Sequence, residues 1–417
     1  MNYDICIVGL GYIGLPTASI FATKGKKVLG VDVRPEVINT INKGKIHFDE
    51  PDLDVLVKAA VQSGNLVAAL KPMHAETFIL AVPTPFKPTE SNPKAPDLSF
   101  VESASRAIAP FVQPGNLVIL ESTSPVGTTE LVRDWIFAEK RKAAGADPEK
   151  TSGEILFAHC PERVLPGQMI KELVSNDRIA GGLTPEAAER ARDLYQTFCS
   201  GHIYLTDART AEMVKLTENS FRDVNIGFAN ELSLICDRLN LDVWDVIQLA
   251  NHHPRVKILQ PGPGVGGHCI AVDPWFIVDS APDEARLIRT AREVNDHKPH
   301  YVLGKILERS SRFKQPAIAC LGLAFKANIE DLRASPAMEI VEHLAMQDSA
   351  SILVVEPNIA ALPRPLENKS NVKLMGLEQA VQAADIVVLL VNHKEFIKLD
   401  RRLLREKVII DTRGVWR

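Results

Sequence analysis

A glycine-rich stretch around one cysteine has the clearest capacity for chemistry in this sequence. The stretch Gly264–Trp275 contains His268, Cys269 and Asp273. Densely spaced glycines leave backbone N–H groups uncovered and let a bulky ligand approach the chain closely. A thiol becomes a nucleophile when its surroundings favour the thiolate, and Cys269 has a histidine beside it and a carboxylate four residues on. On these residues alone, a catalytic nucleophile and an inert buried cysteine remain equal alternatives.

A second stretch with the capacity to bind a ligand lies at the N-terminus. Tyr3–Val8 predicts a buried strand, followed by a G-x-G-x-x-G turn, a helix ending near residue 24 and a second strand, Val28–Val31, closed by Asp32. In this setting the pattern is the fingerprint of a dinucleotide-binding fold, in which the pyrophosphate rests on the helix N-terminus. The positions of this turn expected to contact the cofactor are Gly9, Gly11, Tyr12, Ile13 and Gly14.

The residues after Val31 bear on which dinucleotide binds. Asp32 is placed to accept a hydrogen bond from the ribose 2′-OH and would repel a 2′-phosphate, which favours NAD over NADP. Arg34, two residues further along the chain, is a cation that could instead accommodate the 2′-phosphate of NADP.

Further strand-like segments continue the alternation of strand and helix. Thr77–Val82, Leu117–Leu120 and Ile155–Ala158 are predicted to be buried parallel strands. Ligands bind beyond the carboxyl ends of such strands. The residues expected there near a nicotinamide are Val82, Pro83, Thr84, Thr123 and Glu162. The alternative is that the prolines at these ends merely terminate the strands.

A long helix is predicted from about Asp207 to Leu239. Lys215, Asn219 and Arg222 fall on one face of it, at a spacing that could serve a substrate. The alternative is a solvated face on which Glu218 pairs with Lys215 and Arg222. The other face contains Met213, Leu216, Phe221 and Phe228, and it could pack on a second chain or simply space two domains.

The C-terminal part predicts a second, shorter α/β unit. Its expected strands are Ala317–Leu321, Ile352–Val355, Ile386–Val391 and Val408–Ile410, with a helix cap at Ser335 and Pro336. The first turn, residues 322–326, resembles the N-terminal fingerprint without its full set of glycines. A nucleotide-like ligand other than a second dinucleotide would suit this turn. Lys326, Arg333 and Arg255 are candidate phosphate partners, although each alone could be a surface charge.

Composition places limits on function. The chain has 417 residues, a net charge of −4, 46% hydrophobic and 24% charged residues, which predicts several globular domains and no nucleic-acid or anionic-membrane partner. No apolar run reaches the ~18 residues of a membrane span, and strand-like sequence at the N-terminus leaves no room for a signal peptide. Six scattered cysteines without a CxxC pair predict neither disulfides nor a metal site. We therefore expect a cytoplasmic protein.

These features together resemble the UDP-glucose/GDP-mannose dehydrogenase family along the whole chain. The matching stretches are residues 8–16, Glu121–Gly127, Lys215–Asn219, Gly266–Cys269 and Ala324–Lys326 with Arg333. Within the family the chain looks most like the UDP-N-acetylhexosamine 6-dehydrogenases, on Glu162–Gly167 and His268–Phe276. Members that oxidise UDP-glucose usually have a small residue at the position of His268 and a lysine at that of Val272, so the resemblance argues against UDP-glucose.

The resemblance implies a four-electron oxidation of a sugar CH₂OH to a carboxylate by two NAD in turn. Cys269 would hold the aldehyde as a thiohemiacetal and then a thioester, and Lys215 and Asn219 would stabilise charge on the C6 oxygen. Asp273, Glu162 and Thr123 would position or activate water, with the base among them left open. The residues implied to contact the UDP-sugar are Arg163, Val164, Lys215, Asn219, Arg222, Arg255, Gly266, His268, Phe325, Lys326 and Arg333.

The same resemblance implies the architecture and the substrate class. The expected fold is α/β, with two Rossmann-like doubly wound domains joined by a long central helix that builds a homodimer. The expected division is an NAD-binding domain at 1–200, a helical region at 201–300 and a UDP-sugar-binding domain at 301–417. UDP-ManNAc is the first expected substrate, with UDP-GlcNAc or UDP-GalNAc as alternatives and surface polysaccharide biosynthesis as the role.

Two alternative functions are also compatible with the sequence. A two-electron hydroxy-acid dehydrogenase would make one NADH per turnover and would not need the second nucleotide-like unit. A non-catalytic NAD-binding module would have no reason to keep Lys215, Asn219, Cys269 and Asp273 together.

Overall fold

The computed structural model describes residues 3–89, 92–144, 155–347 and 349–417. The chain groups into two compact units, residues 1–218 and residues 219–417. The boundary falls inside one continuous helix, α9 (Ala208–Arg238), close to the predicted limits of 207 and 239. The division into three regions is not tested by this grouping and stays a prediction.

The first unit is built on an eight-stranded sheet in the order β3-β2-β1-β4-β5-β6-β7-β8. Strands β1 to β6 run parallel, whereas β7 is antiparallel to β6 and β8 is parallel to β7. The strand bounds are β1 (Tyr3–Val8), β2 (Val28–Val31), β3 (Leu66–Ala69), β4 (Ala75–Leu80), β5 (Leu117–Leu120), β6 (Leu156–His159), β7 (Arg178–Gly182) and β8 (Ile203–Asp207).

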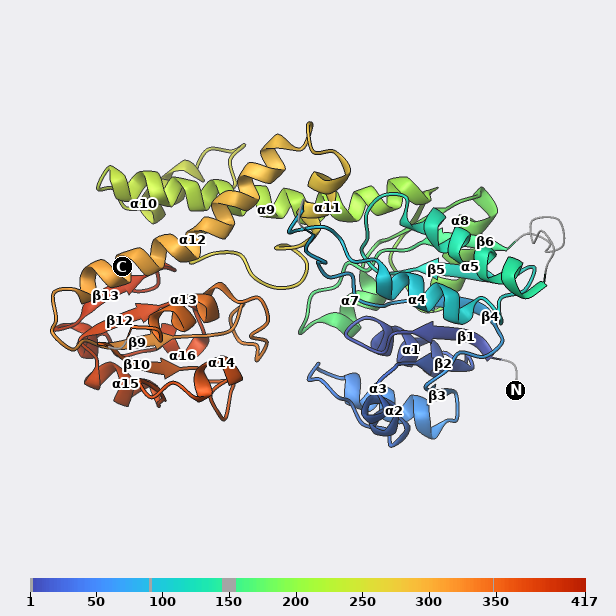
Figure 1. The fold of residues 1–417 in the computed structure, drawn as a ribbon, viewed down its shortest axis with the longest axis horizontal. Helices are drawn as coiled ribbons and strands as arrows, with labels where there is room; N and C mark the ends of the chain where they lie inside the picture. The colour runs from blue at the N-terminus through green and yellow to red at the C-terminus, as the bar shows by residue number, and fades with distance from the viewer. Residues whose placement is uncertain (1–2, 90–91, 145–154, 348) are drawn as a thin grey trace. The chain divides into compact units, whose positions relative to one another are not determined.

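Helices cover both faces of this sheet (Figure 1), which confirms the doubly wound arrangement. One apolar core holds side chains of α1 (Gly14–Thr23), α2 (Pro35–Asn42), α3 (Leu53–Gln62), α7 (Met169–Ser175) and α8 (Pro185–Tyr195). The core on the other face holds α4 (Ser99–Ile108) and α5 (Thr128–Ala144). Both faces are covered because these strands are apolar on both sides; β2 and β5 are buried at every position.

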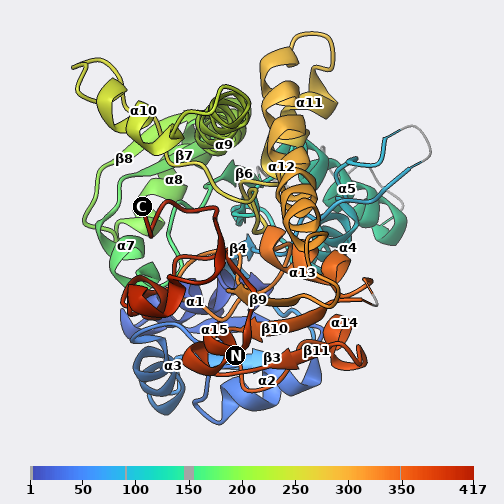
Figure 2. The same cartoon turned by 90° about the vertical axis from the view of Figure 1, so that its left-hand side faces the viewer.

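The second unit is built on a five-stranded parallel sheet in the order β11-β10-β9-β12-β13. Its strands are β9 (Ala317–Leu321), β10 (Ser351–Val355), β11 (Val372–Leu374), β12 (Ile386–Leu389) and β13 (Val408–Asp411). One core holds α12 (Arg286–Ser310), α13 (Pro336–Leu344) and α14 (Arg364–Glu367), and the other holds α15 (Leu377–Ala383), α16 (Lys394–Ile397) and η1 (Arg401–Leu404). Figure 2 shows α12 and α13 beside this sheet. The predicted cap of α13 is present, since the Ser335 hydroxyl accepts from the backbone of Met338 at 3.3 Å.

Two shorter helices, α10 (Val243–Ala250) and α11 (Asp273–Ser280), complete the second unit. Its part of α9 is tied to α12 by buried polar groups. The carboxylate of Asp223 lies 2.6 Å from the guanidinium of Arg292 and accepts from the amide of Asn295 at 2.8 Å. Asn230 donates to Asn295 and accepts from the backbone of Gly262 at 2.9 Å, which anchors the start of the glycine-rich loop.

The face of α9 predicted to pack on another chain is mixed. Phe221 and Phe228 are exposed by 71% and 53%, and Met213 is also exposed. Leu216 is fully buried, so its assignment to that face was wrong. Leu216 and Phe221 are five residues apart, about 500° around the helix axis, so their side chains point about 140° apart.

Candidate active site

The first glycine turn has the shape that a dinucleotide requires. A Cβ on Gly14 would lie 1.8 Å from the carbonyl oxygen of Gly9, so helix α1 can approach the turn only with glycine there. A Cβ on Gly11 would meet nothing within 4 Å in the protein. The structure itself therefore gives no packing reason for Gly11, and the close approach of a pyrophosphate does. Tyr12 and Ile13 complete this turn, and the Tyr12 ring lies 4.3 Å from that of Phe48.

Asp32 follows β2 and closes on this turn. Its carboxylate accepts from the backbone of Leu10 at 3.2 Å, and Arg34 bonds both carboxylate oxygens, with Nε at 3.1 Å and Nη2 at 3.3 Å. Burial acts to raise the pKa of Asp32, but the hydrogen bonds from Arg34 and Leu10 outweigh it and hold that pKa below its ordinary value. Asp32 is thus ionised, as an acceptor for a ribose hydroxyl must be.

The strand ends after β4 and β5 are joined to each other. The Thr84 hydroxyl donates to the carbonyl of Thr123 at 2.6 Å, and the Ser122 hydroxyl donates to the carbonyl of Val82 at 2.6 Å. The structure therefore brings the predicted cofactor residues of these two loops together, with Pro83 between them.

Glu162, three residues after β6, is buried and held at both oxygens. Oε1 accepts from the backbone of Arg163 at 2.6 Å, and Oε2 lies 2.7 Å from the guanidinium of Arg178. The Arg163 side chain pairs with Glu218 at 2.6 Å. Glu218 thus has Arg163 as its ion-pair partner in place of the Lys215 and Arg222 considered from spacing. Val164 packs against the core of this unit.

Lys215 is half-buried on α9, and its charge affects the pKa of a buried histidine, His159. Burial, and then the charge of Lys215, lower the pKa of His159 to about 3. His159, fully buried, is therefore neutral at the end of β6.

The nucleophile candidate is distinguished by its exposure. Cys269 is exposed, whereas the other five cysteines are buried. The backbone N–H groups of Val272 and Asp273 both donate to the carbonyl of Cys269, at 3.0 and 2.8 Å, which folds the chain back in one turn. Asp273 opens α11 and is buried, and its Oδ2 accepts from the Asn219 amide at 2.5 Å. The structure thus joins two predicted catalytic side chains, Asn219 and Asp273, and places the thiol one turn away from them in the chain.

The glycine-rich loop packs on the second glycine turn within the same unit. A Cβ on Gly266 would lie 2.4 Å from the carbonyl of Ala334 and 2.9 Å from the Phe325 side chain, so only glycine allows this approach. Arg333 lies next to this contact and bonds Asp331 through two hydrogen bonds of 2.8 and 2.6 Å. Lys326 is half-buried.

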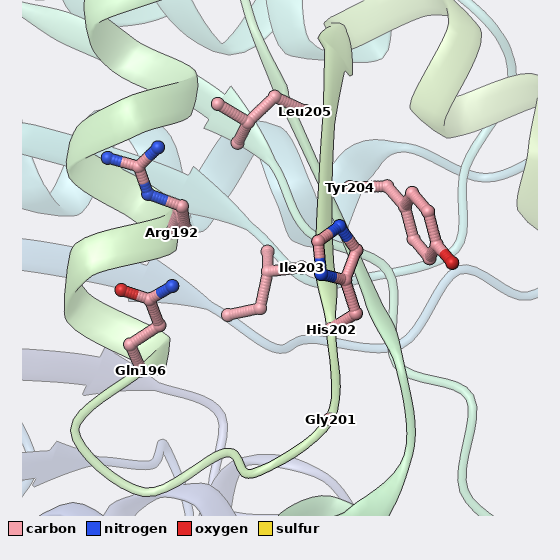
Figure 3. A pocket seen from close by; sticks show the side chains of 7 residues that line it. All are labelled: Arg192, Gln196, Gly201, His202, Ile203, Tyr204 and Leu205. Carbon is pink, nitrogen blue, oxygen red and sulfur yellow. The ribbon is translucent and has the colours of Figure 1, made fainter.

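Other predicted substrate residues lie on the surface. His268, Arg222 and Arg255 are exposed, and Arg255 lies in the segment after α10, where its backbone donates to His253. A hollow of about 490 Å³ lies elsewhere, between α8 and the edge strand β8 (Figure 3), and none of the predicted site residues lines it.

Two buried residues of this region were not predicted from the sequence: Arg178, which bonds Glu162, and Tyr195, whose ring lies against Arg178. Arg178 opens β7, a five-residue strand that ends in two glycines, and Tyr195 ends α8 without a motif that marks it as part of a site. Among the described residues, no cluster of His, Cys, Asp or Glu could hold a metal ion, and no helix is long and apolar enough to cross a membrane.

Comparison with known families now identifies the chain's relatives. The NAD binding domain of the UDP-glucose/GDP-mannose dehydrogenase family matches residues 3–199, the central domain matches 209–297, and the UDP binding domain matches 319–417. The chain belongs to the UDP-glucose/GDP-mannose dehydrogenase family. This match confirms the predicted family and NAD as the cofactor.

Individual relatives refine the comparison. The chain is 58% identical to an NDP-N-acetyl-D-galactosaminuronic acid dehydrogenase of Ralstonia nicotianae, covering 99% of this chain and 96% of the relative. It is 57% identical to a UDP-N-acetyl-D-mannosamine dehydrogenase of Campylobacter jejuni, covering 95% and 96%. A solved UDP-D-ManNAc dehydrogenase from Pyrococcus horikoshii superposes with a TM-score of 0.87 at 39% identity, covering 100% and 96%.

Proposed function

We propose that this protein oxidises the C6 hydroxymethyl group of a UDP-N-acetylhexosamine to a carboxylate, using NAD twice. The observation that carries the proposal is the exposed Cys269 in a glycine-rich loop, one chain turn from the bonded pair Asn219 and Asp273. A two-electron dehydrogenase has no use for a nucleophilic thiol. We also propose the three-part division 1–200, 201–300 and 301–417, with NAD in the first part and UDP in the third.

Cys269 retains the intermediate between the two oxidations. NAD, when bound, would supply the hydride acceptor for each oxidation. In the first oxidation C6 loses a hydride and its hydroxyl loses a proton to a base, which leaves the aldehyde. After the first, the thiol adds to the aldehyde, forming the S–C6 bond and passing its proton to the aldehyde oxygen. Loss of the second hydride from this thiohemiacetal, together with the hydroxyl proton, leaves a thioester. Water then breaks the S–C6 bond, which releases the carboxylate and returns the thiol.

Lys215 and Asn219 act on the C6 oxygen. A side-chain amide has two N–H groups, and the bond from Asn219 to Asp273 uses one of them. The second N–H and the Lys215 ammonium can then stabilise negative charge on oxygen, an effect typically worth ~10²–10³ in rate for one fixed donor. Asp273, Glu162 and Thr123 are the proposed groups that position or activate water.

UDP-ManNAc is the first proposed sugar, with UDP-GalNAc and UDP-GlcNAc as the alternatives. The resemblance in residues 268–276 favours the N-acetylhexosamine branch. The relatives at 58% and 57% identity bear names with different sugars, which keeps UDP-GalNAc as a specific second candidate. UDP-glucose should be poor, because a site that bonds an acetamido group leaves polar partners unpaired when that group is missing.

A panel of UDP-sugars tests the proposal through the number of NADH made per sugar. Two NADH per UDP-N-acetylhexosamine are expected, with kcat/KM for UDP-glucose lower by at least about tenfold. One NADH per sugar would favour the two-electron alternative, and an equal kcat/KM for UDP-glucose would overturn the N-acetylhexosamine assignment.

Two substitutions of Cys269 test the covalent step. Cys269→Ala should bind NAD and UDP normally and make almost no NADH, because the first oxidation runs uphill without capture of the aldehyde. Cys269→Ser should react slowly and accumulate an adduct detectable by mass, because a hydroxyl is far less ionised than a thiol. Two NADH per sugar at full rate from Cys269→Ala would exclude the thiol from the reaction.

We also propose that the protein is a homodimer formed through α9. Phe221, Phe228 and Ile235 follow one another at intervals of seven residues and are exposed by 71%, 53% and 47%. This spacing places them along one stripe of the helix, as in helix pairs. A dimer mass in analytical ultracentrifugation that falls to a monomer mass in Phe228→Glu supports this assignment, and a wild-type monomer excludes it.

A further inference from the structure

A buried polar cluster stands behind Glu162 in the first unit. Its members are Glu162, Arg178, Tyr195 and Glu121, which are exposed by 9%, 4%, 1% and 2%. Burying four polar side chains together costs folding free energy unless they bond one another. Their contacts therefore show what the cluster stabilises.

The reversal of β7 brings Arg178 to Glu162. β6 and β7 are antiparallel, with Ala158 opposite Gly182 and His159 opposite Gly181. Continuing this register beyond the end of β6 puts Glu162 opposite Arg178, the first residue of β7. If β7 ran parallel to β6, its first residue would lie at the amino ends of the parallel strands. Ligands bind at the opposite, carboxyl ends.

The guanidinium of Arg178 lies against two aromatic rings and is hydrogen-bonded at one end. Its central carbon lies 4.7 Å from the Tyr195 ring centroid and 5.4 Å from that of Phe198. Nη2 donates to Glu162 at 2.7 Å, whereas Nε and Nη1 have no hydrogen-bond partner among the described residues. The rings attract the cation through their faces, which accounts for burial with so few hydrogen bonds.

The second carboxyl of the cluster does not receive a bond from Arg178. Glu121 accepts from the Tyr195 hydroxyl at 2.6 Å through Oε1, and its Oε2 has no partner among the described residues. Burial, and then the charge of Glu162, raise the pKa of Glu121 to about 7. Within this cluster the cation, Arg178, therefore bonds Glu162, whereas Glu121 accepts from the neutral hydroxyl of Tyr195.

We propose that Arg178 is the positioning residue of Glu162: packed against Tyr195 and Phe198, it holds the Glu162 carboxylate in one orientation at the strand ends where ligands bind. This inference rests on the proposed function of Glu162 as a group that positions or activates water. Arg178 itself contacts neither substrate nor cofactor in this assignment and acts through Glu162 alone.

A double-mutant cycle with Arg178→Met, Glu162→Gln and the double variant tests this assignment. If Arg178 acts through Glu162, each single variant lowers kcat by about 10²-fold or more with KM changed by less than about threefold. The double variant should be no slower than Glu162→Gln, because two groups that act as one unit do not give multiplying effects. Arg178→Lys keeps the charge without the guanidinium group and should restore part of kcat.

Controls separate positioning from loss of structure. Arg192→Met changes the same residue type on the neighbouring helix α8, where Arg192 pairs with Asp193 on the surface, and it should leave kcat within about twofold. Arg178→Met alone leaves buried carboxylates without a cation and can unfold the protein, whereas the double variant removes both charges and should recover the melting temperature.

The outcomes distinguish the two proposals. Multiplying kcat losses in the double variant, or a normal kcat in folded Arg178→Met beside a slow Glu162→Gln, would overturn the role of Arg178. A normal kcat in Glu162→Gln would instead overturn the proposed function of Glu162. In that case the recovered melting temperature of the double variant would still show that the two side chains are coupled.

Discussion

Each unit has an acidic residue directly after the second strand of its sheet in chain order, Asp32 after β2 and Glu356 after β10. Each of these acids accepts a backbone hydrogen bond from the turn that follows the first strand of its unit. Asp32 accepts one backbone N–H of its turn, from Leu10, and otherwise bonds Arg34, whose side chain is 50% exposed. Glu356 accepts two, from Leu323 at 2.8 Å and Ala324 at 3.1 Å. Asp32 thus has a half-exposed side chain as its main partner, whereas Glu356 uses one oxygen, Oε2, for both backbone N–H groups of its turn.

A buried histidine completes the second arrangement. His393 lies 3.1 Å from Glu356, and both side chains are fully buried. The backbone of Asn328 donates to His393 Nδ1 at 2.9 Å, so the ring proton is on Nε2 and donates to Glu356. Burial acts to raise the pKa of Glu356, but these hydrogen bonds outweigh it and hold that pKa below its ordinary value.

The difference shows how one position of a fold can serve a ligand or the protein itself. Glu356 has no oxygen to offer a ribose, because Oε2 is bonded by the turn backbone and His393, and Oε1 accepts from the backbone and the side-chain amide of Asn358 at 3.2 and 3.1 Å. The second turn also has no glycine set for a pyrophosphate. The second unit is thus closed to a second dinucleotide at this position, in agreement with the UDP binding domain that matches it.

The largest expected effect is on stability, from Glu356→Ala. The substitution leaves two turn N–H groups and His393 without their partner in a buried place, which should cost about 3–5 kcal/mol. Hydrogen exchange measured by mass spectrometry should locate the loss in peptides of β9, β10 and β12. NAD affinity should stay unchanged, and exchange as slow as in the wild type would show that Glu356 is not structural.

The pH dependence of stability should run in opposite directions at two buried carboxyls, one in each unit. The folded pKa of Glu121 is raised to about 7, so folding favours its protonated form and the stability it confers falls as pH rises from about 4.3 to about 7. The folded pKa of Glu356 is lowered, so its contribution is complete above about 4.3 and is lost on acidification below that value.

Glu121→Gln isolates the first of these effects, because glutamine can still accept from Tyr195 and cannot ionise. Relative to the wild type, the variant should gain about 3 kcal/mol between about pH 4.5 and pH 8. Denaturant unfolding across this range, read through exchange of β5 and α8 peptides, measures the difference. A difference that does not vary with pH would mean that Glu121 is ionised in the folded protein across the whole range.

Asp32→Ala is the matched substitution in the first unit and should affect binding more than stability. Loss of a charged acceptor for the ribose 2′-OH should weaken NAD by about 1.5–3 kcal/mol, roughly 10- to 100-fold in Kd. Exclusion of NADP should be relieved, because the repelling carboxylate is gone. Calorimetric titration with both cofactors measures this, and an unchanged Kd for NAD would remove Asp32 from the cofactor site.

Local patterns predicted a large part of this fold. β1, β2, β5 and β9 occupy the residues expected from short apolar runs, and the cap at Ser335 is as expected. The full length of α12 is not evident from such patterns, because the helix continues through Pro299 to Ser310 although proline usually ends or kinks a helix. The edge strand β8, whose residues are largely exposed, was not predicted, because its only apolar run is the three residues Ile203–Leu205.

The candidate site shows the limit of such patterns. The roles of Cys269, Asn219 and Asp273 stay predictions, although the structure brings the last two together. Arg178 could not be assigned to Glu162, because their contact depends on the reversed direction of β7. Nor could Glu356 be told from Asp32, because the histidine that engages it lies 37 residues further along the chain.

The smallest expected effect is that of Arg34→Ala, and it sharpens the comparison by removing the exposed partner of Asp32. The Arg34 side chain is 50% exposed, so solvent screens its pair with the buried Asp32. Loss of the pair should therefore cost only about 1 kcal/mol of stability. Freed from Arg34, Asp32 should bind the ribose at least as well, leaving Kd for NAD within about threefold. Binding of NADP should weaken, since the cation nearest to a 2′-phosphate is lost while the carboxylate remains. Titration of wild type, Arg34→Ala and Arg34→Lys with both cofactors measures these changes, and the lysine variant should retain the wild-type preference. A loss of NAD affinity of tenfold or more in Arg34→Ala would show that Arg34 itself holds the cofactor and that Asp32 serves to orient it.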